Sequence, residues 1–156
     1  MNIAFNSTED SAETFLEGLE RRFESEIRPR LQLAGAEAFR ELVLNNFGAE
    51  HHPNDRPVPW KSLTIKYAKR KHAGNTDPTL ILTGLLKNSV QVESRPEFAE
   101  VYSNVDYAMA HQEGVSDHNL PARPFFPMDE SGNATSFARE RIFQAIEAEL
   151  EAALNE

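Results

Sequence analysis

Residues 105–126 place the tightest limits on how this chain can fold, because glycine and proline fix the backbone within a short span. Residues 107–113 have the composition of a short helix, and Gly114 is placed to end it, since glycine readily adopts the left-handed conformation found at helix ends. Residues 121–126 read Pro-Ala-Arg-Pro-Phe-Phe. Each proline disfavours helical backbone at the residue before it, so this segment is predicted to be extended and is a candidate edge strand.

The first 48 residues have the spacing of amphipathic helices. Apolar side chains recur every four residues within 11–27: Phe15, Leu19, Phe23 and Ile27. A second helix is predicted to run to about residue 46, with an apolar row of Phe39, Val43 and Phe47. Pro29 lies between the two rows. It either starts the second helix in its first turn or kinks one long helix, and both arrangements remain open.

The middle of the chain predicts a β-hairpin. Residues 89–93 and 98–105 alternate in polarity, and the four residues between them suit a hairpin loop. Short helices are predicted over residues 62–71 and 80–86, and a last helix over residues 135–153. The predicted fold class is α+β, with long N-terminal helices and a C-terminal helix packed on a small antiparallel sheet, and residues 1–156 are expected to form one domain.

Several apolar residues outside these rows are predicted to be buried. Trp60 is the only tryptophan, and it is expected to attach the proline-rich loop of residues 49–60 to the rest of the protein. Leu82, Leu85 and Leu86 are candidate core residues, and Gly84 is expected to permit a turn or a close backbone approach.

Charge is distributed unevenly in this acidic chain, whose formal net charge is -9. Residues 1–50 carry a net charge of -5, residues 51–90 carry +5, and residues 91–156 carry -9. Opposite charges on different parts of one molecule suit head-to-tail self-association. A set of solvated charged faces is an equally good interpretation. The net negative charge argues against general affinity for nucleic acids or anionic membranes.

Cysteine is absent, which excludes disulfides, zinc-thiolate sites and thiol catalysis. No stretch approaches the roughly 18 apolar residues that a membrane-spanning helix needs, so no membrane partner is expected.

The glycine- and proline-bounded stretch is interpreted as a surface that docks onto another protein, because it combines aromatic residues with arginine and contains no recognisable nucleophile or phosphate loop. The protein-interface candidates are Tyr107, His111, Gln112, Arg123, Phe125 and Phe126. Arg123 is expected to pair in a bidentate manner with a carboxylate of a neighbouring subunit.

A second candidate surface is basic and aromatic. The basic patch consists of Lys61, Lys66, Lys69, Arg70 and Lys71, with Trp60 and Tyr67 nearby. This composition is typical of segments that contact nucleic-acid backbones and stack on bases. A solvated or protein-docking face is the favoured interpretation, and DNA contact is the alternative.

Histidines raise the possibility of a metal hydrolase that uses His51, His111 and His118. Catalytic zinc usually has three convergent protein ligands, and these spacings match no recurrent ligand pattern. No catalytic sequence motif is present either. We therefore expect no metal, no cofactor and no catalytic residues.

Five separate pieces of the sequence, taken in order, resemble the phage virion morphogenesis family, also called the tail-completion proteins of contractile-tailed phages. The pieces are Phe47, Trp60-x-x-Leu63-Thr64, Ile81-Leu82-Thr83-Gly84-x-Leu86-x-x-Ser89 with Val101, Tyr107-Ala108-x-x-His111-Gln112-x-Gly114, and Pro121-Ala122-Arg123-Pro124-Phe125. They span roughly residues 40–130. The family usually has an Asp-Gly or similar turn before the tryptophan, whereas this chain has Arg-Pro-Val-Pro at residues 56–59.

The resemblance implies a structural virion component that is not an enzyme. Such proteins act late in tail assembly, at the head-proximal end of the tail or in the neck, and work as rings. The implied partners are other copies of the chain and the tail tube, terminator or neck proteins, with possible DNA contact in a channel. The implied location is the tail–neck region of the virion, and the host cytoplasm during assembly.

Overall fold

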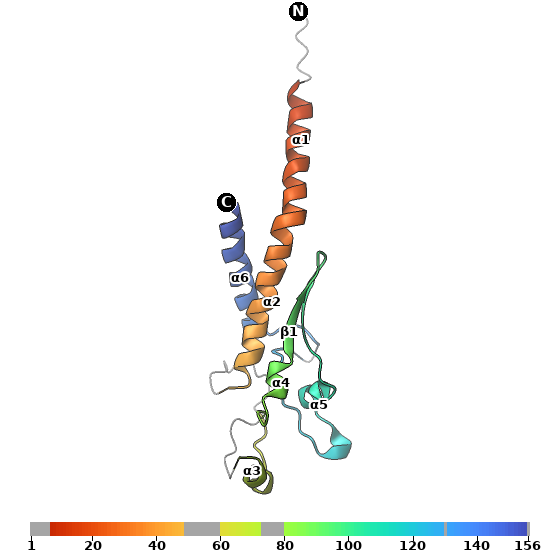
Figure 1. Cartoon of the computed structure of the whole chain (residues 1–156), viewed down its shortest axis with the longest axis vertical. Coiled ribbons are helices and arrows are strands. Elements are labelled where there is room, and N and C mark those ends of the chain that lie inside the picture. The colour runs from red at the N-terminus through yellow and green to blue at the C-terminus, as the bar shows by residue number, and fades with distance from the viewer. Residues whose placement is uncertain (1–6, 49–59, 73–79, 130, 156) are drawn as a thin grey trace, which may run out of the picture.

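The computed structural model describes residues 7–48, 60–72, 80–129 and 131–155. A long N-terminal helix, a C-terminal helix beside it and a two-stranded antiparallel sheet form an α+β fold, as predicted (Figure 1). The elements in chain order are α1 (Ser7–Arg22), the π-helical η1 (Phe23–Ile27), α2 (Arg28–Asn45), α3 (Ile65–His72), α4 (Leu85–Asn88), β1 (Val90–Ser94), β2 (Ala99–Ser103), α5 (Ala108–Glu113), the 3₁₀ turn η3 (Ser116–His118) and α6 (Ser136–Leu154).

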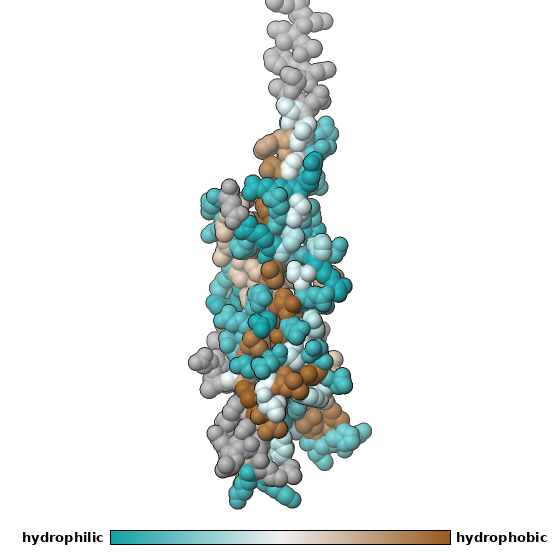
Figure 2. Space-filling view, in the orientation of Figure 1, coloured by the Kyte–Doolittle hydropathy of each residue, from teal (hydrophilic) through white to brown (hydrophobic). Residues whose placement is uncertain are grey.

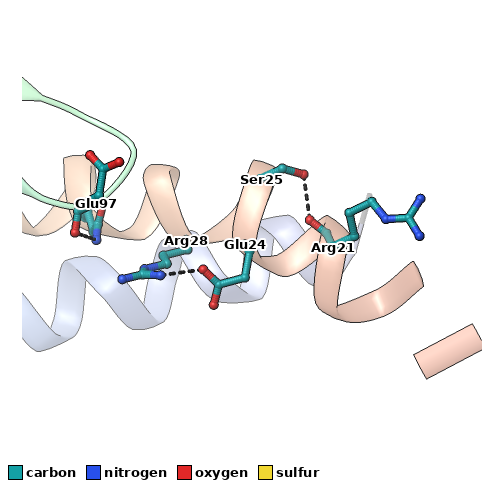
Figure 3. A network of polar contacts seen from close by, with 6 residues as sticks. Arg21, Glu24, Ser25, Arg28 and Glu97 are labelled. Carbon is teal, nitrogen blue, oxygen red and sulfur yellow. Dashed lines mark hydrogen bonds and ion pairs between the residues drawn. The ribbon is translucent and has the colours of Figure 1, made fainter. Parts of the chain in front are cut away.

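The N-terminal helix runs through Pro29 without a break, which selects the single long helix from the two predicted arrangements. Proline has no N–H to donate and crowds the carbonyl four residues earlier. The wider π turn just before it relieves this crowding, and the Arg28 N–H there bonds to the Phe23 carbonyl. Figure 3 shows two side-chain contacts across this segment, from Arg28 to Glu24 and from the Ser25 hydroxyl to the Arg21 carbonyl.

The apolar row predicted on the first part of this helix is mostly exposed. Phe15, Leu19 and Phe23 have exposed fractions of 64%, 47% and 42%, and only Ile27 is buried. The prediction of a buried face was therefore wrong for α1. The physical reason is visible in Figure 1, where α1 extends beyond the hairpin and the end of α6.

Helices α2 and α6 pack along each other, and Gly35 permits their close approach. A Cβ atom at Gly35 would lie 3.2 Å from Ile146 and 3.3 Å from Ile142. Arg30 Nε donates to Glu149 Oε1 at 2.7 Å across the same pair of helices. α6 begins after Thr135, whose hydroxyl accepts a hydrogen bond from the Ala138 N–H as an N-cap.

The predicted hairpin is confirmed, with Val90 opposite Ser103 and Ser94 opposite Ala99. Its turn is closed by the Arg95 N–H donating to the Phe98 carbonyl at 2.8 Å. Two side chains attach it to α2. Arg40 donates to the Val90 carbonyl at 3.1 Å, and Gln32 donates to the Glu97 carbonyl at 2.9 Å.

The core lies where α2, α4, β1 and the segment after α5 meet. Its fully enclosed members are Val43, Phe47, Leu86, Val90 and Phe125. The prediction that Phe39, Val43 and Phe47 share a buried row is confirmed, with Phe39 packed against the core from its edge. Leu86 is buried as predicted, whereas Leu82 and Leu85 are 60% and 54% exposed. These two leucines lie before and at the start of a helix of only four residues, which can bury one side but not both.

Three further predictions need correction. The helix expected from residue 62 begins at Ile65, and the helix expected over residues 80–86 is reduced to α4. The candidate edge strand at residues 121–126 is extended but pairs with no strand among the described residues. The proline-rich loop lies outside the described residues except for Trp60.

Candidate functional site

The stretch from α5 to Phe126 forms a compact loop that returns on itself. Gly114 ends α5 with φ of +78°, as predicted. A Cβ atom there would lie 2.6 Å from the Ala122 nitrogen and 2.9 Å from the Leu120 oxygen, so only glycine fits. Val115 and Leu120 exchange backbone hydrogen bonds of 2.8 and 3.0 Å. The loop thereby brings residues 121–126 back beside α5, where the Arg123 N–H donates to the His111 carbonyl at 2.7 Å.

Gln112 makes backbone hydrogen bonds to the returning segment of the kind that a neighbouring strand would otherwise make. Its Oε1 accepts hydrogen bonds from the N–H groups of Phe125 and Phe126 at 2.9 and 3.0 Å. Its Nε2 donates to the Phe126 carbonyl at 3.3 Å. A side-chain amide carries both a donor and acceptors, so it can satisfy two backbone N–H groups and one carbonyl. In this structure Gln112 therefore organises the loop from within.

Arg123 is buried, with 5% of its surface exposed. Its Nε and Nη2 both donate to the Lys61 carbonyl, at 3.2 and 2.9 Å. Burial lowers the pKa of the Arg123 guanidinium from its ordinary value, and Tyr67 opposes this shift. The expectation of a surface arginine was wrong: the bidentate fork is present, but its partner is a backbone carbonyl of the same chain.

The two phenylalanines after Arg123 also point inward. Phe125 is fully buried against Phe47, with ring centroids 5.1 Å apart, and Phe126 packs on Phe125 at 5.1 Å and on Phe39 at 6.1 Å. The expectation that this aromatic pair lies on the surface was wrong for Phe125 and correct only in part for the half-buried Phe126. Aromatic rings of this size gain most by joining the core.

Two residues from other elements secure the same segment. Trp60 Nε1 donates to the Pro124 carbonyl at 2.9 Å, so the tryptophan itself is attached to the rest of the protein, whereas residues 49–59 of the loop it was expected to hold lie outside the described residues. Asn46 is fully buried at the end of α2, and its Nδ2 donates to the Phe125 carbonyl at 2.9 Å. Sequence reasoning missed Asn46. The signal available was an asparagine at the end of a helix beside a core phenylalanine.

An open groove of about 580 Å³ lies where residues 61–64, 82–86, 107–111 and 121–123 meet. Its apolar lining includes Leu63, Tyr67, Leu82, Leu85, Tyr107 and Leu120. His111 also lines it, and its ring meets the Tyr107 ring edge-on with centroids 5.8 Å apart. Tyr107, at 41% exposed, and the half-buried His111 are thus the members of the predicted interface set that face outward here.

Cations edge this groove. Lys61 and Arg123 line it, and Lys66 and Lys69 are exposed on the adjoining α3. Arg70 and Lys71 continue α3, but their side chains lie outside the described part of the chain. α3 lies at the opposite end of the molecule from α1 (Figure 1). No described residue lining the groove carries a carboxylate.

The described residues contain no group of three or more histidines, aspartates and glutamates placed to hold a metal ion. His51 and His52 lie outside those residues, so the metal-hydrolase hypothesis is not tested at its first ligand. None of the helices in the described ranges is both long and apolar enough to cross a membrane.

Fold and groove together define a class: an α+β protein in which motif segments far apart in the sequence converge on one cation-edged apolar groove. The chain belongs to the phage virion morphogenesis family, whose sequence profile matches residues 9–151. The family resemblance drawn from the motifs is therefore confirmed over nearly the whole chain.

A further similarity is to an uncharacterised protein of Methanocaldococcus jannaschii, 37% identical over 75 residues. The match covers 45% of this chain and 56% of that protein, so the chain spans about half the length of this relative. No solved structure matches the chain.

Proposed function

We propose that this protein completes the head-proximal end of a phage tail, or forms part of the neck, and so makes the tail competent to join a head. Membership of the phage virion morphogenesis family over residues 9–151 is the observation that carries this proposal. The family supports a role in virion assembly generally. The specific step and position are proposed here on the grounds of the surface that the chain presents.

That surface suits protein docking. Leu82 and Leu85 line the groove and are 60% and 54% exposed, and Tyr107 adds an aromatic ring to the same lining. Exposed apolar side chains gathered around a groove mark interaction sites on soluble proteins. Aromatic residues are enriched at the centres of such interfaces. Behind the groove, Gln112 and Arg123 hold its wall in one conformation, which lowers the entropic cost of binding.

The proposed mechanism is shape and charge complementarity, with no covalent chemistry. The functional unit is a ring of several copies, because the unlike charges of different segments favour contacts between subunits. In this role Tyr107 and His111 contact the neighbour directly. Gln112, Arg123 and Phe125 act indirectly, by holding the segment that forms the groove wall.

A nucleic-acid contact by α3 is the second candidate function, favoured by one observation. Lys66 and Lys69 are exposed on a short helix at one end of the molecule, where they could face a DNA channel (Figure 1). DNA retention that falls steeply with salt and is lost in Lys66→Gln/Lys69→Gln would support this function.

Deletion of the gene from its phage tests the proposal. Tails and filled heads should accumulate separately, with tails of normal length, and electron microscopy should show few joined particles. Expression of the protein in trans should restore joining. Joined, infectious particles at normal yield without the protein would contradict the proposed step.

A further inference from the structure

Helix α1 presents an apolar face that nothing in the described chain covers. Phe15, Leu16 and Leu19 are 64%, 62% and 47% exposed, and they lie close together because residues three and four apart share a helix face. Figure 2 shows hydrophobic atoms on this part of the helix, above the main body. An amphipathic helix normally packs its apolar face against other protein atoms, so the exposed face of α1 is a candidate contact surface.

An acidic row runs beside this apolar face. Glu13, Glu17 and Glu20 follow at intervals of four and three residues, so they share one side of α1 next to the leucines. All three are exposed. The surface of α1 therefore combines an apolar stripe with a negative edge, and its complement is an apolar groove with a positive edge.

The groove at the other end of the molecule has that complement. Leu82 and Leu85 are exposed on its apolar side, and Lys61, Lys66 and Lys69 supply positive charge at its rim and on α3. Arg123 adds a buried positive charge whose hydrogen-bond partner is a carbonyl. With no carboxylate among the described lining residues, the groove attracts an acidic segment.

We propose that α1 of one copy docks into the groove of a second copy, with Phe15, Leu16 and Leu19 on the apolar floor and the glutamate row toward the lysines. An amphipathic helix laid in an apolar groove is a recurrent mode of recognition. α1 and α3 lie at opposite ends of one molecule, so the helix cannot fill its own groove (Figure 1). This inference rests on the self-association within the proposed function.

The contact is head-to-tail. Each copy offers a helix at one end and a groove at the other, so successive copies form a ring if the rotation closes and a filament if it does not. Antiparallel pairing of two α1 helices would bring two acidic rows together, and like charges disfavour that arrangement. The charge pattern therefore favours docking of α1 into the groove over this pairing of two α1 helices.

A mixing experiment tests the direction of this contact. The helix variant is Phe15→Glu/Leu19→Glu, and the groove variant is Leu82→Glu/Leu85→Glu; all four residues are exposed, so both variants should keep the wild-type melting temperature. Wild type should self-associate. Each variant alone should be monomeric, with affinity weakened about thirtyfold or more, as expected for interface hot spots.

An equimolar mixture of the two variants restores one intact contact, between the groove of the helix variant and α1 of the groove variant. Light scattering should then find a dimer of two 17.6 kDa chains and nothing larger. A groove variant that still self-associates, a mixture that stays monomeric, or a wild-type chain that is monomeric at every salt concentration would each overturn the proposal.

Phe143→Glu/Leu154→Glu on α6 is the matched control, because Phe143 and Leu154 are 63% and 70% exposed and the two substitutions add the same charge on another helix. It should leave self-association unchanged, and an equal loss there would also overturn the proposal. The outcome is separable from that of the proposed function. If mixing restores the dimer while deletion phages still join heads to tails, the contact between copies is supported and the tail-completion step is contradicted. If mixing fails to restore the dimer while deletion phages do not join heads to tails, the tail-completion step is supported and this contact is contradicted.

Discussion

At Arg123, a charged side chain holds two distant backbone segments together from inside the molecule. Its two donors converge on the Lys61 carbonyl while its own backbone N–H bonds to His111. Hydrogen bonds from a charged donor contribute more than neutral ones, and a planar guanidinium suits a forked contact better than a lysine does. Arg123 is therefore one of the side chains, with Gln112, that hold the wall of the groove in place.

Arg123→Ala should lower the free energy of unfolding by about 1.5–3 kcal/mol, the range for hydrogen bonds to charged groups. Arg123→Lys should recover only part of the loss, since an ammonium cannot reproduce the fork. Chemical denaturation measures both. Arg95→Ala, which removes an exposed guanidinium beside Glu93 and over the Phe98 ring, is the control and should lower the free energy of unfolding much less than Arg123→Ala does. Equal midpoints for the Arg123 variants and the wild type would contradict the structural role.

Gly114→Ala should destabilise the protein strongly. The positive φ alone costs an alanine roughly 1–3 kcal/mol, and the new Cβ would lie 2.6 Å from the Ala122 backbone. Gly132 is the matched control because it has φ of +80° with nothing within 4 Å of a Cβ. Thermal unfolding should show a clearly larger loss for Gly114→Ala than for Gly132→Ala. Similar losses would mean that the loop relaxes around the added methyl group.

At the scale of elements, α2 organises the fold and α1 extends from it. The spacing of Phe39, Val43 and Phe47 predicted the buried side of α2, because regular apolar periodicity reports burial wherever a helix is covered. The same periodicity failed on α1, since the sequence does not say whether a partner within the chain covers an apolar face. The hairpin was predictable from local alternation and its short turn.

The contacts of the site were less predictable than its position. Some of the motif residues do meet at one groove, but the inward orientation of Arg123 and Phe125 depends on the loop that returns at Gly114. The partners that fix this loop come from elsewhere in the sequence: Asn46 from the end of α2 and Lys61 from the segment before α3. Such long-range pairings are set by tertiary structure, and no local pattern identifies the partner residue.

Gly35→Val should disturb the packing of α6 on α2. Added methyl groups would meet Ile142 and Ile146, which already lie 3.2–3.3 Å from the position of a Cβ. Overpacking of this kind costs about 1–3 kcal/mol. Gly18→Val on α1 is the control, because nothing lies within 4 Å of a Cβ there. The midpoint of global unfolding should fall for Gly35→Val and change little for Gly18→Val, and the opposite order would refute the close approach.

At the scale of the whole molecule, charge is separated along the length. The acidic α1 lies at one end and the basic α3 at the other (Figure 1). Charge separated in this way favours contacts between unlike ends of two copies and disfavours contacts between like ends. This separation of charge is compatible with the family's role in virion assembly, because it favours end-to-end contacts between copies.

Self-association should weaken as salt is added, because exposed charges are screened beyond about 10 Å at 0.1 M ionic strength. Sedimentation at rising salt should show a progressive loss of the larger species, while the melting temperature of the monomer changes little. Association that strengthens with salt would point to purely apolar contacts and contradict the role given to the lysine and glutamate rows.

Titration of purified protein into tails that lack it tests tail completion most directly. Head joining should rise in proportion to the protein added and stop at a fixed whole number of copies per tail, counted by quantitative mass spectrometry of the joined particles. A structural ring component must act in such stoichiometric amounts. Full restoration of joining by far less than one copy per tail, with none retained in the product, would contradict the structural role and indicate catalysis instead.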